Sequence, residues 1–186
     1  MAVPTTMTSI PGAGAPPTVA AWEAAFARAL PYAEFLAAHA TPDQRARWDA
    51  VQSRVVLTPP QQRLLSGFVR RMPVLVLAGA WCGDCVSQCP IFARFAEAHL
   101  RVCGGQRVPV AAFFSEDFSP VVFYGDRTLS AYRAAAATQA GAACATGISK
   151  PDSDGQAATI SDWLDQFERV HLILRLSARL REKHGD

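Results

Sequence analysis

The chain has 186 residues, of which 50% are hydrophobic and 18% are charged, and its formal net charge is +2. A hydrophobic core is available, which excludes wholesale disorder, and the near balance of charge argues against nucleic-acid binding driven by bulk charge. Five cysteines are too few for a disulfide scaffold, and no apolar run approaches the roughly 18 residues that span a membrane. The N-terminus lacks a basic segment followed by an apolar core, so we expect no secretory signal and a cytoplasmic protein with reduced cysteines. Arginine outnumbers lysine 16 to 2, which is typical of a GC-rich bacterial genome.

The first part of the chain predicts a tail followed by helices. Residues 1–18 are rich in proline, glycine, serine and threonine, a composition that predicts a disordered tail. Residues 19–72 form a predicted helical segment, in which Pro31 divides the first run of apolar residues at helical spacing. Thr41 and Thr58 each precede a proline, and this pair predicts a helix start because proline suits the first helical position.

The sequence predicts strands in the middle of the chain. Residues 72–78 are nearly all apolar and rich in branched side chains, which is typical of a strand buried on both faces beneath helices. Further elements are predicted as a helix over 82–99, antiparallel strands at 110–114 and 121–124, and helices over 130–143 and 160–184. These elements divide the rest of the chain into a core at 73–140 and a loop with a C-terminal helix at 141–186.

A pair of cysteines lies between the buried strand and the helix that follows it, in the run Trp81-Cys82-Gly83-Asp84-Cys85. Cys82 would lie at the helix N-terminus, where unsatisfied N–H groups and the helix dipole stabilise a thiolate. Cys85 would lie one turn into the helix, close enough to form a short disulfide. In this arrangement the first thiolate attacks a substrate disulfide and the second thiol resolves the mixed disulfide.

The motif W-C-G-x-C resembles that of the thioredoxin family, and the spacing of other residues supports the resemblance. Pro90 lies five residues after Cys85, where thioredoxins carry a proline in this helix. Val108 and Pro109 precede an apolar strand, as in the family's cis-proline loop, and Gly125 follows 16 residues later. The resemblance covers residues 73 to about 140.

The resemblance implies roles for individual residues. Cys82 would be the nucleophile and Cys85 the resolving thiol. Pro109, in a cis peptide bond, would face the dithiol and help to hold an extended substrate segment. The implied substrate-binding residues are Trp81, Gly83, Asp84, Val108 and Pro109. Pro120 is the competing cis-proline candidate, but the glycine spacing then fails.

Two residues depart from the family pattern near the dithiol. Asp84 stands where thioredoxins typically have proline, and its charge near Cys82 would oppose thiolate formation. A second hypothesis is that Asp84 serves as a proton acceptor. Val76 stands six residues before Cys82, where thioredoxins often carry a buried acid. We therefore expect that the family's usual proton-transfer route through this acid is absent.

A third departure concerns the length of the core. If the helix after the motif ends near His99, only residues 100–108 remain before the cis-proline, and a crossover to a parallel strand needs a dozen or more residues. We therefore expect an α/β, thioredoxin-like three-layer fold with a reduced central sheet, lacking the strand–helix crossover before the cis-proline, and with extra helices at both ends. The edge of the strand at 73–78 would then need cover from the terminal helices or from a second subunit in a homodimer.

The function predicted from these residues is thiol–disulfide exchange by Cys82 and Cys85 without a bound cofactor. Its partners would be a disulfide-containing protein or small molecule and an external reductant, with no nucleic acid and no membrane. Two alternatives stay open. One is a non-catalytic, thioredoxin-like binding module. The other is a zinc or iron–sulfur site built on Cys82, Cys85, Cys89 and Cys103, although their spacing matches no familiar metal motif and packing explains Cys89 and Cys103 better.

Overall fold

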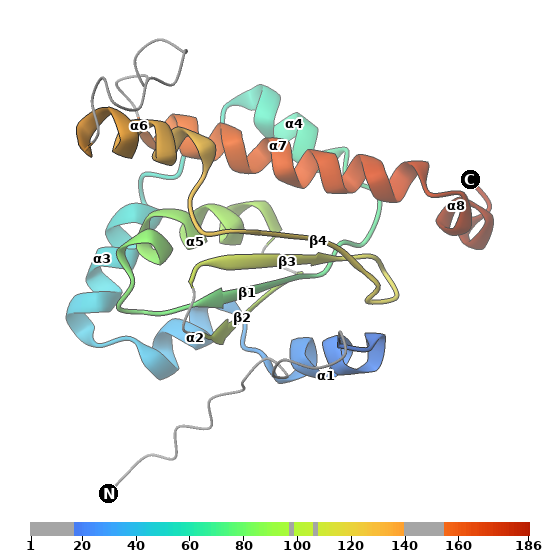
Figure 1. Cartoon of the computed structure of the whole chain (residues 1–186), viewed down its shortest axis with the longest axis horizontal. Helices are drawn as coiled ribbons and strands as arrows, with labels where there is room; N and C mark the ends of the chain where they lie inside the picture. The colour runs from blue at the N-terminus through green and yellow to red at the C-terminus, as the bar shows by residue number, and fades with distance from the viewer. Residues whose placement is uncertain (1–16, 97–98, 106–107, 140–154) are drawn as a thin grey trace, which may run out of the picture.

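A computed structural model of the protein describes residues 17–96, 99–105, 108–139 and 155–186. A central sheet lies between helix α1 on one face and a larger group of helices on the other (Figure 1). The helices are α1 (Val19–Arg28), α2 (Tyr32–His39), α3 (Pro42–Gln52), α4 (Pro59–Ser66), α5 (Gly83–Ala96), α6 (Leu129–Gln139), α7 (Gly155–Leu176) and α8 (Ala178–His184). The strands are β1 (Val74–Ala78), β2 (Leu100–Gly104), β3 (Val110–Phe114) and β4 (Pro120–Gly125). Most of the predicted N-terminal tail and of the predicted loop before α7 lies outside the described residues.

The sheet has four strands in the order β2-β1-β3-β4. β1 pairs in parallel with β2 on one side and antiparallel with β3 on the other, and β3 pairs antiparallel with β4. Every residue of β1 is buried, as its unbroken apolar run predicts for a central strand. The three-layer thioredoxin-like fold class is therefore confirmed, including the hairpin of β3 and β4.

One part of the fold prediction is corrected, because the strand expected to be missing is present. β2 pairs with β1 from Val74 opposite Leu100 to Ala78 opposite Gly104, and helix α5 is the crossover between the two strands. No second crossover is needed before the cis-proline, because β3 is antiparallel to β1 and begins at the end of the sheet where β2 ends. The chain crosses only two interstrand spacings, about 10 Å, between Gly104 and Val110.

The outer edge of β2 is partly covered by the N-terminal segment. The backbone of Leu30 exchanges two hydrogen bonds with that of Val102, with N–O distances of 3.0 and 2.7 Å. Pro31 directly after this bridge separates α1 from α2, as its position in the sequence predicts. The segment between these two helices thus takes the place of a fifth strand, and the edge is blunted within the same chain.

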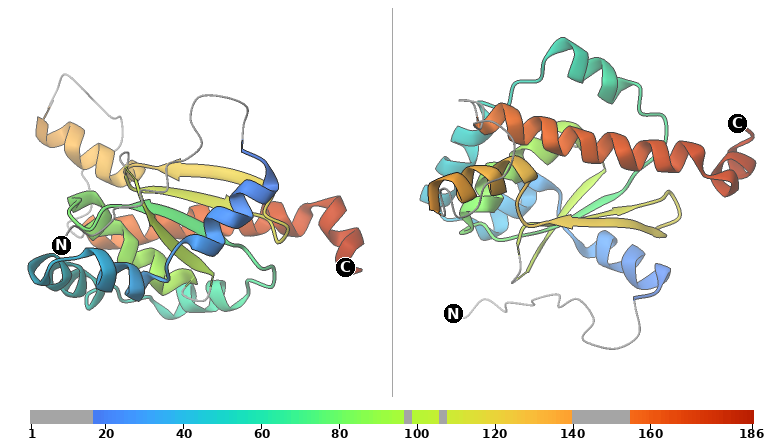
Figure 2. Two further views of the ribbon diagram at one scale, coloured as in Figure 1. Left: turned by 90° about the horizontal axis from the view of Figure 1, so that it is seen from below. Right: turned by 45° about the horizontal axis from the view of Figure 1, so that its top comes forward.

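The two faces of the sheet bury different helices (Figure 2). Val74 and Val76 face the larger core, which contains residues from α2, α3, α5 and α7. Leu75 faces a smaller core that is covered by α1, where the ring of Trp22 lies 5.3 Å from that of Phe114. This alternation follows from the two-residue period of a strand. Both cores share the sheet, so the N-terminal helices, the sheet and the C-terminal helix pack together as one structure.

Local signals in the sequence account for several helix ends. Thr41 and Thr58 each form a capping box, and a proline occupies the first helical position after each of them. The predicted C-terminal helix is divided, because Ser177 ends α7 and caps α8 through its side chain. Gly185 ends α8 in the left-handed conformation with a φ of 73°. Among the described residues, no helix is both long and apolar enough to cross a membrane.

Candidate functional site

The dithiol lies where β1 turns into α5. The backbone N–H of Cys82 donates to the carbonyl of Gly79 at 3.0 Å, and the carbonyl of Cys82 accepts from Val86 at 3.0 Å in the first turn of the helix. Cys82 is therefore fixed at the helix N-terminus, as predicted. Its exposed fraction is 9%, whereas Cys85, one turn further on, is completely buried. Of the two thiols, only Cys82 has a surface that a substrate disulfide can contact.

Cys85 accepts a hydrogen bond at its sulfur. The backbone N–H of Gly79 donates to Cys85 Sγ at 3.4 Å. Cys89 lies one further turn along α5 and is 1% exposed. Cys89 is buried in the larger core, as the sequence analysis expected for a packing residue. All four described cysteines are free thiols.

The thiol pKa values differ from those expected at a helix N-terminus. Burial raises the pKa of Cys82, and hydrogen bonds from the backbone N–H groups of Cys85 and Asp84 oppose this effect only in part. The hydrogen bond from Cys89, followed by those from Gly79 and Cys82, overcomes burial and lowers the pKa of Cys85 to about 7. Burial raises the pKa of Cys89 well above its usual value. The three thiols interact, so the first deprotonation is a property of the group and is not assigned to Cys82 alone.

The predicted cis-proline loop faces Cys82. The peptide bond between Val108 and Pro109 is cis, and the thiol of Cys82 lies 3.8 Å from the carbonyl oxygen of Val108. A Cβ atom on Gly125 would come within 2.5 Å of the Pro109 carbonyl oxygen, so only glycine allows the end of β4 to approach this loop. Glycine at position 125, which the sequence analysis identified by its spacing, is therefore required for steric reasons. Pro120, the competing candidate, begins β4 and has no cis bond.

Asp84 has a partner that the sequence analysis missed. Both of its carboxylate oxygens lie 3.1 Å from Nε of Arg127, which follows β4. The guanidinium partly neutralises the charge that was expected to oppose thiolate formation beside Cys82. Hydrogen bonding to Asp84 raises the pKa of Arg127 in return. The sequence separation of 43 residues gives no indication of this contact. The one signal in the sequence was the position of Arg127 just after Gly125.

Gln88 was also missed by the sequence analysis, and it holds the far side of the site together. Its side chain is 2% exposed and accepts a hydrogen bond from Trp163 Nε1 at 2.8 Å. Its amide nitrogen donates to the carbonyl of Asp126 at 2.9 Å. One side chain on α5 thus connects α7 to the loop that carries Arg127. The signal in the sequence was a glutamine among the apolar residues of this helix, because a polar side chain that becomes buried needs hydrogen-bond partners.

Trp81 lies at the rim of the site and not in the core. Its exposed fraction is 63%, and its ring covers Gly79, where a Cβ atom would lie 2.8 Å from the ring. Gly83 is also exposed. Behind the turn, the indole N–H of Trp48 on α3 donates to the carbonyl of Ala80 at 2.9 Å. The N-terminal helices therefore fix the backbone from which the rim projects.

A four-cysteine metal site does not assemble. Cys82, Cys85 and Cys89 belong to the larger core, whereas Cys103 packs with the smaller core on the opposite face of the sheet. Burial also raises the pKa of Cys103 to about 11, which disfavours the thiolate that a metal requires. Among the residues that the structure describes, no group of three or more histidine, cysteine or acidic side chains is arranged to hold a metal ion. Cys144 lies outside those residues.

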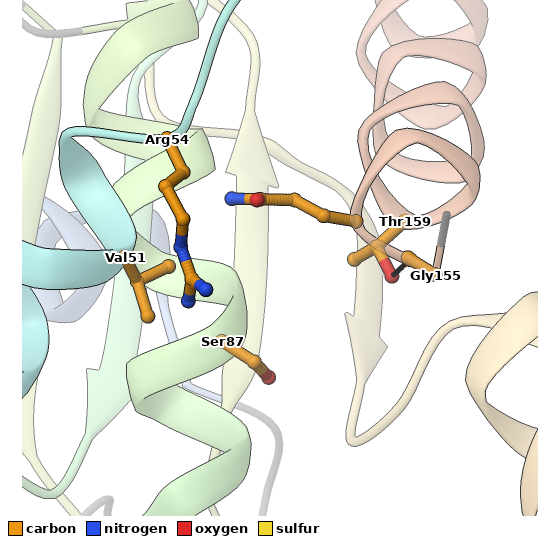
Figure 3. A pocket seen from close by; sticks show the side chains of 6 residues that line it. Val51, Arg54, Ser87, Gly155 and Thr159 are labelled. Atoms are coloured by element: carbon orange, nitrogen blue, oxygen red, sulfur yellow. Dashed lines mark hydrogen bonds between the residues drawn. The ribbon is translucent and has the colours of Figure 1, made fainter. Parts of the chain in front are cut away.

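A cavity of about 300 Å³ lies on another side of α5, between α3 and the start of α7 (Figure 3). The guanidinium of Arg54 projects into it toward Ser87 and α7. The lining residues are Val51, Arg54, Ser87, Gly155, Gln156 and Thr159. None of them belongs to the dithiol or to the cis-proline loop, so this cavity is separate from the candidate site.

Comparisons with known proteins support the fold. A family model described as thioredoxin matches residues 29–102, a range that begins before α2 and includes both cysteines of the dithiol. A crystal structure of a protein of unknown function from Pseudomonas aeruginosa is similar at a TM-score of 0.61 and 16% identity, covering 83% of this chain and 99% of that one. An HIV epitope scaffold is similar at a TM-score of 0.58 and 14% identity, covering 79% of this chain and 97% of the scaffold. No curated protein matches the chain. At these identities the two structures show the fold alone.

Proposed function

We propose that the chain, whose residues 29–102 match a family model described as thioredoxin, is a thiol–disulfide oxidoreductase of the thioredoxin family. The observation that carries the proposal is the position of Cys82 between the N-terminus of α5 and the cis-proline loop, with its thiol 3.8 Å from the carbonyl of Val108. Cys85 lies directly behind it, so a nucleophile and a resolving thiol are both present.

The burial of the two thiols supports a division of roles. A substrate disulfide can approach Cys82, which keeps 9% of its surface exposed, but not the fully buried Cys85. The Cys85 thiolate, whose pKa is lowered to about 7, takes the proton of Cys82 as Cys82 attacks. The first step then forms a bond between Cys82 and one substrate sulfur, and the other substrate sulfur leaves as a thiolate that takes up a proton.

The second step returns the enzyme to its oxidised form. The Cys85 thiolate attacks Cys82 Sγ, which forms the Cys82–Cys85 disulfide and expels the second substrate thiolate. Two electrons have then passed from the enzyme dithiol to the substrate disulfide. Trp81, Gly83, Asp84, Val108 and Pro109 surround this reaction, and we assign them to substrate binding as part of the proposal.

The proposal includes the partners that this chemistry requires. The substrate is a disulfide in a protein or a small molecule, and an external reductant regenerates the dithiol. We place the activity in the cytoplasm, where thiols are kept reduced, with no bound cofactor, nucleic acid or membrane. A homodimer is compatible with the reaction but is not needed for it, because both thiols come from one chain.

The decisive experiment compares cysteine variants in the reduction of a disulfide-bonded test protein by an external dithiol. We expect Cys82→Ser to lower the rate by about a hundredfold or more, because the nucleophile is lost. We expect Cys85→Ser to accumulate a mixed disulfide between Cys82 and the test protein, since nothing resolves it. Non-reducing electrophoresis and mass spectrometry detect this species.

Cys103→Ser is the matched control, because Cys103 is a partly buried thiol on the opposite face of the sheet. It should retain the parent rate. Full activity in Cys82→Ser would overturn the proposal, as would the same loss of activity in Cys103→Ser.

A further inference from the structure

The ion pair between Asp84 and Arg127 lies beside the dithiol, and the two-cysteine reaction does not use it. We propose that Arg127 is a positioning residue that balances the charge of Asp84 and through this ion pair sets how readily Cys82 ionises. The inference rests on the proposed function for its biological meaning, because the thiolate of Cys82 is the form that attacks a disulfide.

Asp84 is the acidic side chain nearest to the dithiol along the chain. It lies between Cys82 and Cys85 in the first turn of α5, and the only other charged side chain on this helix is Arg94 in the last turn. A carboxylate within one helical turn of a thiol opposes its ionisation, because the two negative charges repel each other. Without a counter-charge, Asp84 would therefore favour the protonated, unreactive form of the dithiol.

Arg127 supplies the counter-charge from the loop after β4. Both carboxylate oxygens of Asp84 lie 3.1 Å from Nε of Arg127, and the two side chains are 38% and 39% exposed. Solvent screens such a partly buried pair less than a fully exposed one, and a guanidinium keeps its charge wherever a thiol titrates. Among the residues that the structure describes, no second cation pairs with Asp84. The charge of Asp84 is therefore balanced by this one residue.

The loop that carries Arg127 is anchored on both sides of it. The backbone carbonyl of Asp126 accepts a hydrogen bond from Gln88 at 2.9 Å, and the carboxylate of Asp126 accepts one from the backbone N–H of Arg127, also at 2.9 Å. On the other side, Thr128 is completely buried. An anchored guanidinium loses less conformational entropy when it pairs with a carboxylate, so these contacts favour the ion pair.

Substitutions at the pair change its net charge in opposite directions. Arg127→Gln leaves the carboxylate uncompensated, which should disfavour the thiolate. Asp84→Asn leaves the guanidinium uncompensated, which should favour the thiolate. The double variant is neutral, like the parent pair, and should ionise like the parent. A purely structural role of the ion pair would instead move all three variants away from the parent in the same direction.

The test measures the ionisation of Cys82 without requiring catalysis. The reduced protein is alkylated with iodoacetamide between about pH 6 and pH 10, where Asp84 is ionised. Mass spectrometry follows the modification of Cys82, since Cys85 is completely buried. Iodoacetamide is neutral, so an uncompensated charge does not steer it toward the site. Cys85 is the ionisable group that faces Cys82, and it is present in every variant.

We expect the midpoint of the pH profile to move to higher pH in Arg127→Gln and to lower pH in Asp84→Asn. Each shift should be equivalent to about a threefold change in the thiolate population of Cys82. Arg127→Lys keeps the positive charge and should keep the midpoint close to that of the parent.

Arg179→Gln is the matched control for the loss of an arginine from an ion pair. Arg179 pairs with Asp117, which lies in the turn between β3 and β4 at the end of the sheet opposite to the dithiol. This substitution should leave the pH profile unchanged.

An unchanged midpoint in Arg127→Gln would overturn the inference. The same conclusion would follow from a double variant or an Arg127→Lys variant that behaves like Arg127→Gln, or from an equal shift in Arg179→Gln. The expected shifts in a protein that exchanges no disulfides would instead contradict the proposed function and leave the assignment of Arg127 intact. Full disulfide exchange with an unshifted profile in Arg127→Gln would overturn the assignment alone.

Discussion

A methyl group on Gly125 would lie 2.5 Å from the carbonyl oxygen of Pro109 and 3.0 Å from Cα of Val110. Both are backbone atoms, so the clash cannot be relieved by a side-chain rotation. We predict that Gly125→Ala displaces the cis-proline loop from Cys82 and lowers the free energy of unfolding by about 1–3 kcal/mol. Chemical denaturation measures the stability, and the rate of disulfide reduction reports the displacement of the loop.

Gly104→Ala is the matched control for this prediction. It also lies at the end of a strand, but no heavy atom lies within 4 Å of the position of its Cβ. It should change neither the stability by more than about 0.5 kcal/mol nor the rate of reduction. Equal effects of the two substitutions would show that the close approach at Gly125 is not what holds the loop.

At the scale of single residues, the sequence identified candidate residues better than it identified their surroundings. Cys82 and Cys85 were singled out by their place between a predicted strand and a predicted helix, and Pro109 and Gly125 by the resemblance to the thioredoxin family. The partner of Asp84 was not found, because Arg127 lies on a distant loop.

Helix α5 depends on Gln88 for its connection to two other elements. Gln88→Met keeps the size of the side chain but leaves the indole N–H of Trp163 and the carbonyl of Asp126 without this partner. The buried indole N–H of Trp163 costs about 1–3 kcal/mol when it loses its partner, and the half-buried carbonyl of Asp126 costs less. We predict a loss of about 1–3 kcal/mol in the free energy of unfolding, measured by chemical denaturation.

Gln52→Met tests whether the effect belongs to the site or to the chemistry of the substitution. Gln52 is the exposed last residue of α3, so its replacement should leave the stability almost unchanged. If Gln88→Met were as stable as Gln52→Met, the connection between α5, α7 and the loop after β4 would have no energetic importance.

The outcome for strand β2 illustrates what a count of residues can and cannot decide. The short segment between His99 and the cis-proline correctly excluded a second crossover, since no helix fits there. It did not exclude a strand, because α5 already serves as the crossover from β1 to β2. The direction of β3 relative to β1 decided how much chain was needed, and pairing direction depends on distant residues.

On the scale of the whole molecule, His171 makes the docking of the C-terminal helix sensitive to pH. Its ring stacks on Phe68 at 4.4 Å, and its Nδ1 is buried without a hydrogen-bond partner among the described residues. Burial, followed by the positive charges of Arg175 and Arg70, lowers the pKa of His171 against the opposing effect of Glu168. The folded protein therefore holds this imidazole neutral at pH values where the unfolded chain protonates it.

The sign of the effect follows from proton binding. Because the unfolded chain binds the additional proton, stability is fully present above about pH 6.5 and falls as the pH decreases toward the lowered pKa of the folded state. We predict that His171→Gln reduces the loss of stability between about pH 7 and pH 5, by at most about 1.4 kcal/mol per pH unit. Denaturation curves at several pH values measure this, with His39→Gln, at an exposed position, as the control. An unchanged pH dependence in His171→Gln would contradict the prediction.

The sequence by itself determined the features that depend on neighbouring residues. The Thr-Pro helix starts, the buried β1 and the helix that begins at the dithiol follow from turn chemistry, periodicity and capping. Only the tertiary structure decided which groups from distant segments meet. It paired Arg127 with Asp84, bridged Leu30 to β2, placed Cys103 on the far face and buried Gln88 against Trp163. The reason is that hydrogen bonds, charges and burial act through space, whereas a sequence pattern reports only separation along the chain.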